Sequence, residues 1–221
     1  MAVIPRTDDM EYIALSYVWV LGNAQMVTIK DHFASEHDGG LHLPASIPAV
    51  VDNAMTVVRE LGYRYLWVDQ FCIDQNGADK AEHISRMDLI YASAAVTIIA
   101  ASSRGALPGV GSTPRMPQAI VTLGEITIFA TTPFANQAIK SSVWNTRGWC
   151  FQESVLSPRR LYFTDHQVLF QTSSIALSDT FPTLADEDDM HGLQDVMHMR
   201  THEIVFRPRS LCISGFYTCT R

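Results

Sequence analysis

Residues 147–153 hold the side chains with the clearest potential for chemistry. On a helix, Trp149 and Glu153 stand four residues apart and therefore share a face. An indole ring beside a carboxylate attracts positive charge, so the pair suits a cationic ligand or a transition state that develops positive charge. The same sequence also fits a structural arrangement, in which Trp149 fills the core and Glu153 pairs with Arg147 or Arg159 or accepts backbone amide bonds. The local sequence leaves both interpretations open.

Polar and aromatic residues also follow the three segments that we expect to be parallel strands. These residues are Ser16, Tyr17 and Trp19, then Asp69, Gln70, Cys72 and Gln75, and finally Ser102 and Ser103. Ligands of open α/β sheets bind outside the carboxyl ends of the parallel strands, so these side chains form the rim of a candidate site. Two alternatives stay open: Asp69 could cap the turn after its strand, and the tryptophans Trp19, Trp67 and Trp144 could serve packing.

Several other chemistries lack their sequence signatures. The chain contains no GxGxxG and no GxxxxGK[ST] phosphate loop. Its four cysteines form no CxxC pair and show no metal-like spacing to a histidine, so we expect no metal site and a reduced setting. A nucleophile at Cys72 or Cys150 would need a nearby base, for which His83 and His166 are the closest candidates.

The composition predicts one domain with a sizeable core. The chain has 221 residues, of which 47% are hydrophobic, and a formal net charge of -7. This acidic balance argues against a nucleic-acid partner, because phosphate contacts need a basic face. The N-terminus has no apolar run typical of a secretory signal, and no window approaches the roughly 18 apolar residues of a membrane span. We therefore expect a cytoplasmic protein.

The hydrophobic periodicity predicts an alternation of strands and helices in the first half of the chain. Strands are predicted at residues 12–18, 65–68 and 95–101. A helix is predicted over residues 47–61 with Ser46 as its N-cap, and a second helix follows Asp79, which has capping-box spacing to Glu82. The order strand, helix, strand, helix, strand favours a right-handed parallel α/β sheet.

The second half of the chain predicts insertions and a weaker end. The expected elements are an edge strand at 26–29, hairpins at 120–122 with 126–130 and at 160–164 with 168–171, and a helix at 146–156. Beyond residue 173 the pattern fades, and the acidic run 186–189 is expected to be solvated. Residues 1–172 are therefore the predicted domain, and residues 173–221 are a weakly structured or truncated tail.

Four blocks of the sequence resemble the fungal heterokaryon-incompatibility (HET) domain. The blocks YIALSYVW (12–19), YLWVDQFCIDQ (65–75), MDLIYASAAVTIIA (87–100) and RGWCFQESVLSPRR (147–160) are similar to the family patterns ALSYxWG, YLWIDxxCIxQ, M..IY..A..TIIA and RGWxxQE..LS.R. The match covers residues 12–171 in the family order. Val20 departs from it, since the family has a glycine there, which tolerates positive φ and close backbone approach.

The resemblance implies a HET domain over residues 1–172 that serves in self/non-self recognition and programmed cell death. The HET fold is thought to be related to TIR domains, and Trp149-Cys150-x-x-Glu153 is similar to the WCxxE helix of that fold. The resemblance implies a flavodoxin- or TIR-like core of parallel strands with β-hairpin insertions. By analogy with TIR domains that cleave NAD, Glu153 would be catalytic and NAD would be a substrate, with no bound cofactor.

The NAD hypothesis gives substrate-binding roles to seven residues: Ser16, Tyr17, Trp19, Asp69, Cys72, Gln75 and Trp149. Trp149, Tyr17 or Trp19 would stack on the nicotinamide ring, and Asp69 would hold ribose hydroxyls. The alternative is a non-enzymatic module that acts by homotypic assembly or through incompatibility partner proteins. In that case Asp69 and Gln75 would brace loops, and Trp149 would pack in the core.

Overall fold

A computed structural model of the chain describes residues 2–19, 41–43, 46–117, 119–130, 132–179 and 217–220. Nine of its strands form one sheet: β1 (Ala2–Pro5), β2 (Tyr12–Ser16), β3 (Leu41–His42), β4 (Tyr65–Val68), β5 (Val96–Ala100), β8 (Arg160–Phe163), β9 (Val168–Gln171), β10 (Ala176–Ser178) and β11 (Tyr217–Thr220). Their order is β10-β9-β8-β5-β2-β4-β11-β1-β3. The strands of this sheet therefore position the candidate residues that follow them.

The centre of the sheet is parallel and its two margins are antiparallel. Strand β2 pairs in parallel with both β4 and β5, and β5 pairs in parallel with β8. All five residues of β2 and of β5 are buried, as expected of strands covered on both faces. From β2 the chain moves to β4 on one side, whereas β5 lies on the other. The resulting change of direction between β2 and β5 creates a topological switch point.

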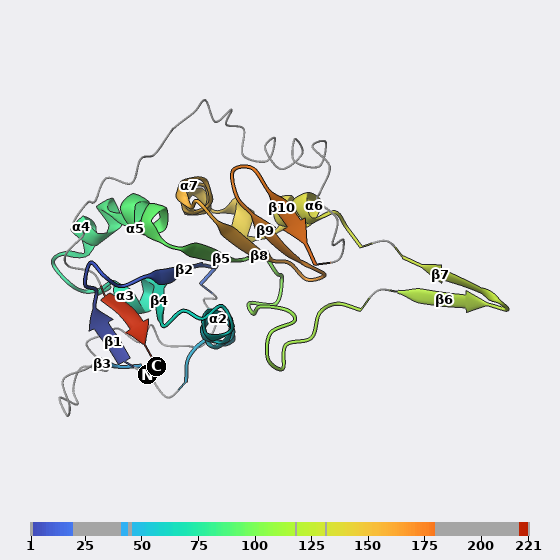
Figure 1. Cartoon of the computed structure of the whole chain (residues 1–221), viewed down its shortest axis with the longest axis horizontal. Helices are drawn as coiled ribbons and strands as arrows, with labels where there is room; N and C mark the ends of the chain where they lie inside the picture. The colour runs from blue at the N-terminus through green and yellow to red at the C-terminus, as the bar shows by residue number, and fades with distance from the viewer. Residues whose placement is uncertain are drawn as a thin grey trace.

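Helices cover both faces of the parallel strands (Figure 1). Helix α2 (Ala49–Glu60) packs on one face through a buried stripe that runs from Val50 to Val58. Helices α5 (Met87–Ser93) and α7 (Gly148–Leu156) pack together on the opposite face. Placement on alternate faces follows from right-handed crossovers, because the chain first moves one way along the sheet and then the other.

Two predicted helix boundaries are wrong. Helix α2 begins after Pro48, whose ψ of 140° is extended, so Ser46 is not its N-cap. The single helix predicted after Asp79 is two helices, α4 (Lys80–Ser85) and α5, separated at the non-helical Arg86. The periodicity did not predict this break, because the buried residues on its two sides keep a continuous helical spacing. No capping bond from the Asp79 side chain forms, and its carboxylate instead lies 3.6 Å from His83 Nδ1.

Both predicted hairpins are confirmed. Strands β6 (Ile120–Leu123) and β7 (Ile126–Phe129) form a separate two-stranded sheet that projects away from the body of the molecule (Figure 1). Gly124 in their turn has φ of 62°, a conformation that favours glycine. Strands β8 and β9 form the second hairpin. β8 is also the fourth parallel strand, which the local pattern did not predict.

Part of the predicted tail belongs to the main sheet. Strand β10 extends the β8–β9 hairpin, and β11 lies between β4 and β1. The sequence missed β11 because its pairing partners are more than a hundred residues away, beyond the reach of local periodicity. The strand predicted at 26–29 and the acidic run 186–189 lie outside the described residues. Three further short helices complete the description: α3 (Asp69–Cys72), α6 (Ala135–Ser141) and the 3₁₀ turn η1 (Trp144–Thr146).

Candidate functional site

Ser16 is the node of a buried polar cluster at the carboxyl end of β2. Its hydroxyl donates to Oε2 of Glu153, which comes from α7, and accepts a bond from Nε1 of Trp144 at 2.6 Å. Ser16, Trp144 and Glu153 are 1%, 3% and 6% exposed. Trp144 is held edge-on against Tyr162 of β8, with ring centroids 6.0 Å apart. A strand end, a 3₁₀ turn and a helix therefore converge on one hydroxyl group.

Asp69 brings a second carboxyl group to the same edge of the sheet. It follows β4 directly, as the first residue of α3. Its carboxylate oxygens accept bonds from the indole Nε1 of Trp19 at 3.1 and 3.2 Å, and the backbone N–H of Gln70 donates at 2.7 Å. The Tyr17 hydroxyl donates to the Gln70 side chain. The segment after β2 is thus tied to the segment after β4, across neighbouring parallel strands.

Arg147 places a positive charge beside both carboxyl groups. Its guanidinium donates to the backbone carbonyl of Tyr17 at 2.7 Å, which fixes it over the end of β2. From there its charge opposes the rise in pKa that burial causes in both Asp69 and Glu153. Arg147 also precedes α7 directly, so the residue that holds this charge also leads into the helix that carries Glu153.

Burial makes both carboxyl groups weaker acids. Desolvation, together with the nearby Glu153 charge, raises the pKa of Asp69 to about 7. The hydrogen bonds from Gln70 and Trp19 and the positive charge of Arg147 oppose this rise. Desolvation likewise raises the pKa of Glu153, opposed by the Ser16 bond and by Arg147. At neutral pH both the protonated and the ionised form of Asp69 are therefore populated. Two interacting carboxyl groups with displaced pKa values are typical of acid–base or cation-stabilising sites.

Neither cysteine near this edge presents a nucleophile. Burial and the Glu153 charge raise the pKa of the Cys150 thiol to about 12, so it is neutral at physiological pH. Cys72 is 0% exposed, and its sulfur accepts a bond from the backbone N–H of Val68 at 3.3 Å. Burial therefore argues against a nucleophile at either cysteine. The burial of Cys72 also gives it a structural role in place of the predicted substrate contact.

The structure brings together five of the predicted site residues: Ser16, Tyr17, Trp19, Asp69 and Glu153. Gln75 braces the loop instead, because its amide donates to the carbonyls of Asp69 and Ile73 at 3.2 Å each. At the end of β5, the Ser103 backbone N–H donates to the Asp165 carboxylate, so that end stabilises a loop.

Trp149 lies outside the buried cluster. It is 49% exposed, whereas the buried residues of α7 are Cys150, Glu153 and Ser154. The four-residue spacing keeps Trp149 and Glu153 close together on the helix, but only Glu153 is buried. Trp149 therefore does not fill the core, as one interpretation of the sequence expected, and its contact with a cationic ligand stays a prediction.

The sequence did not predict the contact of Trp144 with Ser16 or that of Arg147 with Tyr17. Trp144 reaches Ser16 from 128 residues away, and no local pattern signals such a contact. Arg147 or Arg159 was expected to pair with Glu153; Arg147 does act on this carboxyl group electrostatically, and its hydrogen bond goes to the Tyr17 backbone. Tyr91 of α5 also borders the site, since its hydroxyl donates to the Leu15 carbonyl at 3.4 Å.

Within the described ranges, no three His, Cys, Asp or Glu residues are grouped so that they could hold a metal ion. No helix in the same part of the chain is long and apolar enough to cross a bilayer.

The fold and the site together define the class of the protein. It is an α/β domain with two carboxyl groups and an arginine gathered at the carboxyl edge of a mostly parallel sheet.

Comparison with known proteins places this domain in a family. Residues 12–153 match the family model described as heterokaryon incompatibility protein (HET), and this span includes Ser16, Asp69 and Glu153. The chain belongs to this family. It is also similar to heterokaryon incompatibility protein 6, OR allele, of Neurospora crassa, with 31% identity over 129 residues. That alignment covers 55% of this chain and 18% of the Neurospora protein, so the chain corresponds to a small part of that relative. No solved structure matches the chain.

Proposed function

We propose that this HET domain hydrolyses NAD at the Ser16–Asp69–Glu153 edge and that this activity serves heterokaryon incompatibility and cell death. The observation that carries the proposal is the bond between Ser16 and Glu153, with Asp69 in electrostatic range of the same carboxylate. The parallel strands also follow the order β4-β2-β5-β8, which is the flavodoxin-like order of a doubly wound sheet. In such sheets the switch point, here between β2 and β5, is where a nucleotide binds.

In the proposed reaction, the bond between ribose C1′ and the nicotinamide nitrogen breaks and its electron pair leaves with nicotinamide. The ribose then carries oxocarbenium character, which the Glu153 carboxylate stabilises. Water adds to C1′ and gives ADP-ribose, and its proton passes to the carboxylate pair. Ser16 holds the 6% exposed Glu153 side chain in place through its hydrogen bond, and Trp144 in turn fixes the Ser16 hydroxyl.

The substrate would enter past Asp69 and Trp19. Both residues are half-buried, whereas Ser16 and Glu153 are buried, so this is the more open side of the cluster. The Trp19 N–H is bonded to Asp69 and its ring packs partly against the core, so the indole is fixed beside this carboxyl group, where we propose that it stacks on the cationic nicotinamide. Tyr17 is 5% exposed and bonded to Gln70, which favours a positioning role over stacking.

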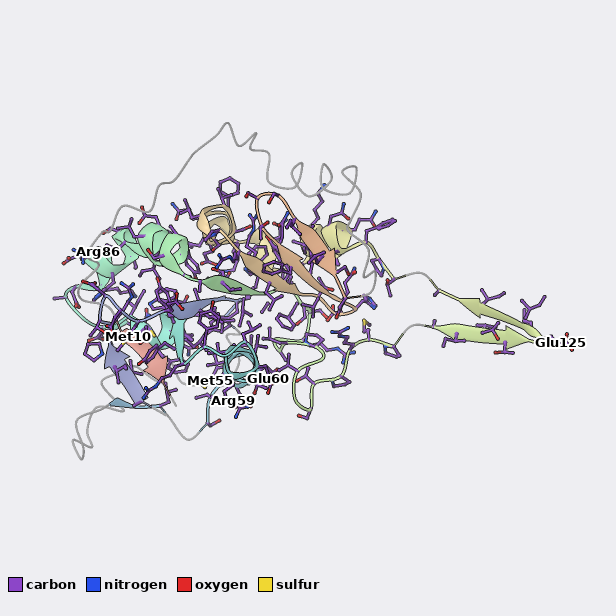
Figure 2. All side chains as sticks on the ribbon, viewed as in Figure 1. Met10, Met55, Arg59, Glu60, Arg86 and Glu125 are labelled. Atoms are coloured by element: carbon purple, nitrogen blue, oxygen red, sulfur yellow. The ribbon has the colours of Figure 1, made fainter. Side chains whose placement is uncertain are left out.

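The test is NAD consumption and nicotinamide release by the purified domain. We expect Glu153→Gln to lower turnover by about 100-fold or more, since the amide cannot stabilise positive charge. Glu60→Gln is the matched control, because Glu60 is an exposed glutamate at the end of α2 (Figure 2). Undiminished turnover in a folded Glu153→Gln variant would remove Glu153 from the mechanism.

A non-enzymatic assembly module is the second candidate. The structural roles of Gln75 and Cys72 favour it, because these motif residues brace the fold instead of facing a ligand. Under this alternative, Glu153→Gln expressed in a fungal host stays as toxic as the wild type. Loss of toxicity with an intact fold supports the enzymatic proposal instead.

A further inference from the structure

The β6–β7 hairpin, which we call the apolar arm (residues 120–129), exposes an unusual amount of apolar surface. Its strands pair Val121 with Ile128 and Leu123 with Ile126, and residues directly opposite in an antiparallel pair share a face. These four side chains therefore form one continuous face. They are 54%, 52%, 63% and 66% exposed, in the order of the pairs.

The opposite face of the arm has a different character. Thr122 and Thr127 are paired there, with their hydroxyl oxygens 3.5 Å apart. The Ile120–Phe129 pair lies on this face too, and Ile120 is 57% exposed, so the threonine face is mixed, whereas the other face is made only of Val, Leu and Ile. The apolar face is the one that water solvates poorly, at about 25 cal/mol for each Å² left exposed.

The arm has little support from the rest of the molecule. Within the described residues β6 and β7 pair only with each other, and the hairpin reaches away from the body with Glu125 at its tip (Figure 2). A lone two-stranded hairpin is marginally stable in water. Residues 120–129 also contain no Pro, Lys or Arg, which are the residues that usually keep exposed strands from associating. The arm therefore leaves an exposed apolar surface that is free of these protective residues.

Charge indicates which partner surface this apolar face fits. Residues 116–139 contain no Lys or Arg, and their one charged residue is Glu125, so an anionic lipid surface has nothing to attract. The chain carries a net charge of -7, so two copies repel each other at most surfaces. The apolar face is an exception, because it carries no charge and its distance from the body keeps the acidic surfaces apart.

We propose that the apolar arm is a homotypic contact, in which Val121, Leu123, Ile126 and Ile128 of two copies of this chain pack face to face about a twofold axis. A flat face of uncharged aliphatic side chains is complementary to itself, as an isologous contact requires. Two such sheets pack about 10 Å apart with their side chains interdigitated. The contact is small beside the about 800 Å² per partner of a stable complex, so the dimer is weak and dependent on concentration.

The first test is sedimentation velocity of the chain across a wide range of concentration. We expect the wild type to shift from monomer to dimer and Leu123→Lys/Ile126→Lys to weaken association at least about tenfold. Thr122→Lys/Thr127→Lys adds the same charge to the opposite face and should dimerise as the wild type does. A monomeric wild type at every concentration, or equal loss in both variants, overturns the proposal.

A second test does not depend on how the lysine variants fold. Under mild oxidation, Leu123→Cys should form a disulfide-linked dimer faster than Thr122→Cys, because only the first places its sulfur in the contact. Equal rates in the two variants overturn the proposal, and so does arm-dependent binding to vesicles of phosphatidylcholine and phosphatidylserine. The NAD proposal is unaffected by either result, since the arm contributes none of its residues.

Discussion

The hydroxyl of Ser16 joins three elements through two hydrogen bonds. It donates to Glu153 and accepts from Trp144, so both of these buried groups depend on it. A buried polar group that loses its partner costs about 1–3 kcal/mol, which exceeds the net contribution of an ordinary hydrogen bond. The position of the proposed catalytic carboxylate is therefore also a question of stability.

Ser16→Ala should lower the free energy of unfolding by about 1–3 kcal/mol, because it leaves the Trp144 N–H and the Glu153 carboxyl without that partner. Urea unfolding followed by tryptophan fluorescence measures this change. Ser85→Ala is the control, since Ser85 is exposed and bonds only within its own helix turn. A loss no larger than that of the control would contradict the role of Ser16 as a node.

Stability should fall as the pH rises from about 4 to about 7. The pKa of Asp69 is about 7 in the folded chain and 3.8 as its ordinary value, so in this interval the folded state binds more protons than the unfolded state. One proton gives a slope of at most about 1.4 kcal/mol per pH unit. The raised pKa of Glu153 acts in the same direction.

Asp69→Asn should flatten that pH dependence and should be more stable than the wild type above pH 7, because the neutral amide avoids the burial of a charge. Unfolding free energies measured at several pH values test this, with Asp52→Asn on the exposed side of α2 as the control. An unchanged slope in Asp69→Asn would show that another group causes it.

At the scale of elements, β11 is the least expected strand of the sheet. It fills the place between β4 and β1, and its Thr218 is 0% exposed, with no hydrogen-bond partner for its hydroxyl among the residues that the structure describes. An orphaned hydroxyl in the interior costs free energy that a shape-matched apolar side chain avoids. The strand therefore contributes through backbone pairing and packing, and its hydroxyl group opposes that contribution.

Thr218→Val should raise the free energy of unfolding by about 1 kcal/mol. Thr97→Val in β5 is the matched control and should have the opposite sign, because the Thr97 hydroxyl is equally buried but bonded to Ser157 Oγ at 2.7 Å. Chemical denaturation of both variants measures the two changes in unfolding free energy. Destabilisation of Thr218→Val to the extent of Thr97→Val would mean that the Thr218 hydroxyl has a partner.

At the scale of the whole molecule, the apolar arm and the sheet are structurally separate. The backbone N–H of Ala130 donates to the carbonyl of Ala119 at 2.8 Å, so the two ends of the arm lie side by side. The chain can thus cross this point without the hairpin. The sheet, its covering helices and the Ser16 node contain no residue of the arm.

Replacement of residues 120–129 by two glycines should leave the body folded. We expect its unfolding free energy to change by no more than about 1 kcal/mol, because the arm makes no strand pairing with the main sheet among the described residues. Self-association should be lost. Circular dichroism, denaturation and sedimentation velocity measure the three properties. Unfolding of the body would show that the arm supports the sheet.

The sequence by itself determined the local elements and the family. Apolar runs predicted β4 and β5, periodicity predicted α2, and turn residues predicted both hairpins, because each of these signals is contained within a few neighbouring residues. It also placed Ser16 and Asp69 at strand ends, since parallel strands deliver their last residues to one edge. These properties follow from chain chemistry over short distances.

Only the tertiary structure decided how the pieces meet. The insertion of β11 into the sheet, the use of β8 as a fourth parallel strand and the bond from Trp144 to Ser16 join segments far apart in the chain. The tertiary structure also decided which side of α7 is buried, so Glu153 is buried and Trp149 is exposed. Such pairings depend on the total burial and hydrogen bonding of the folded chain, which no short window of sequence contains.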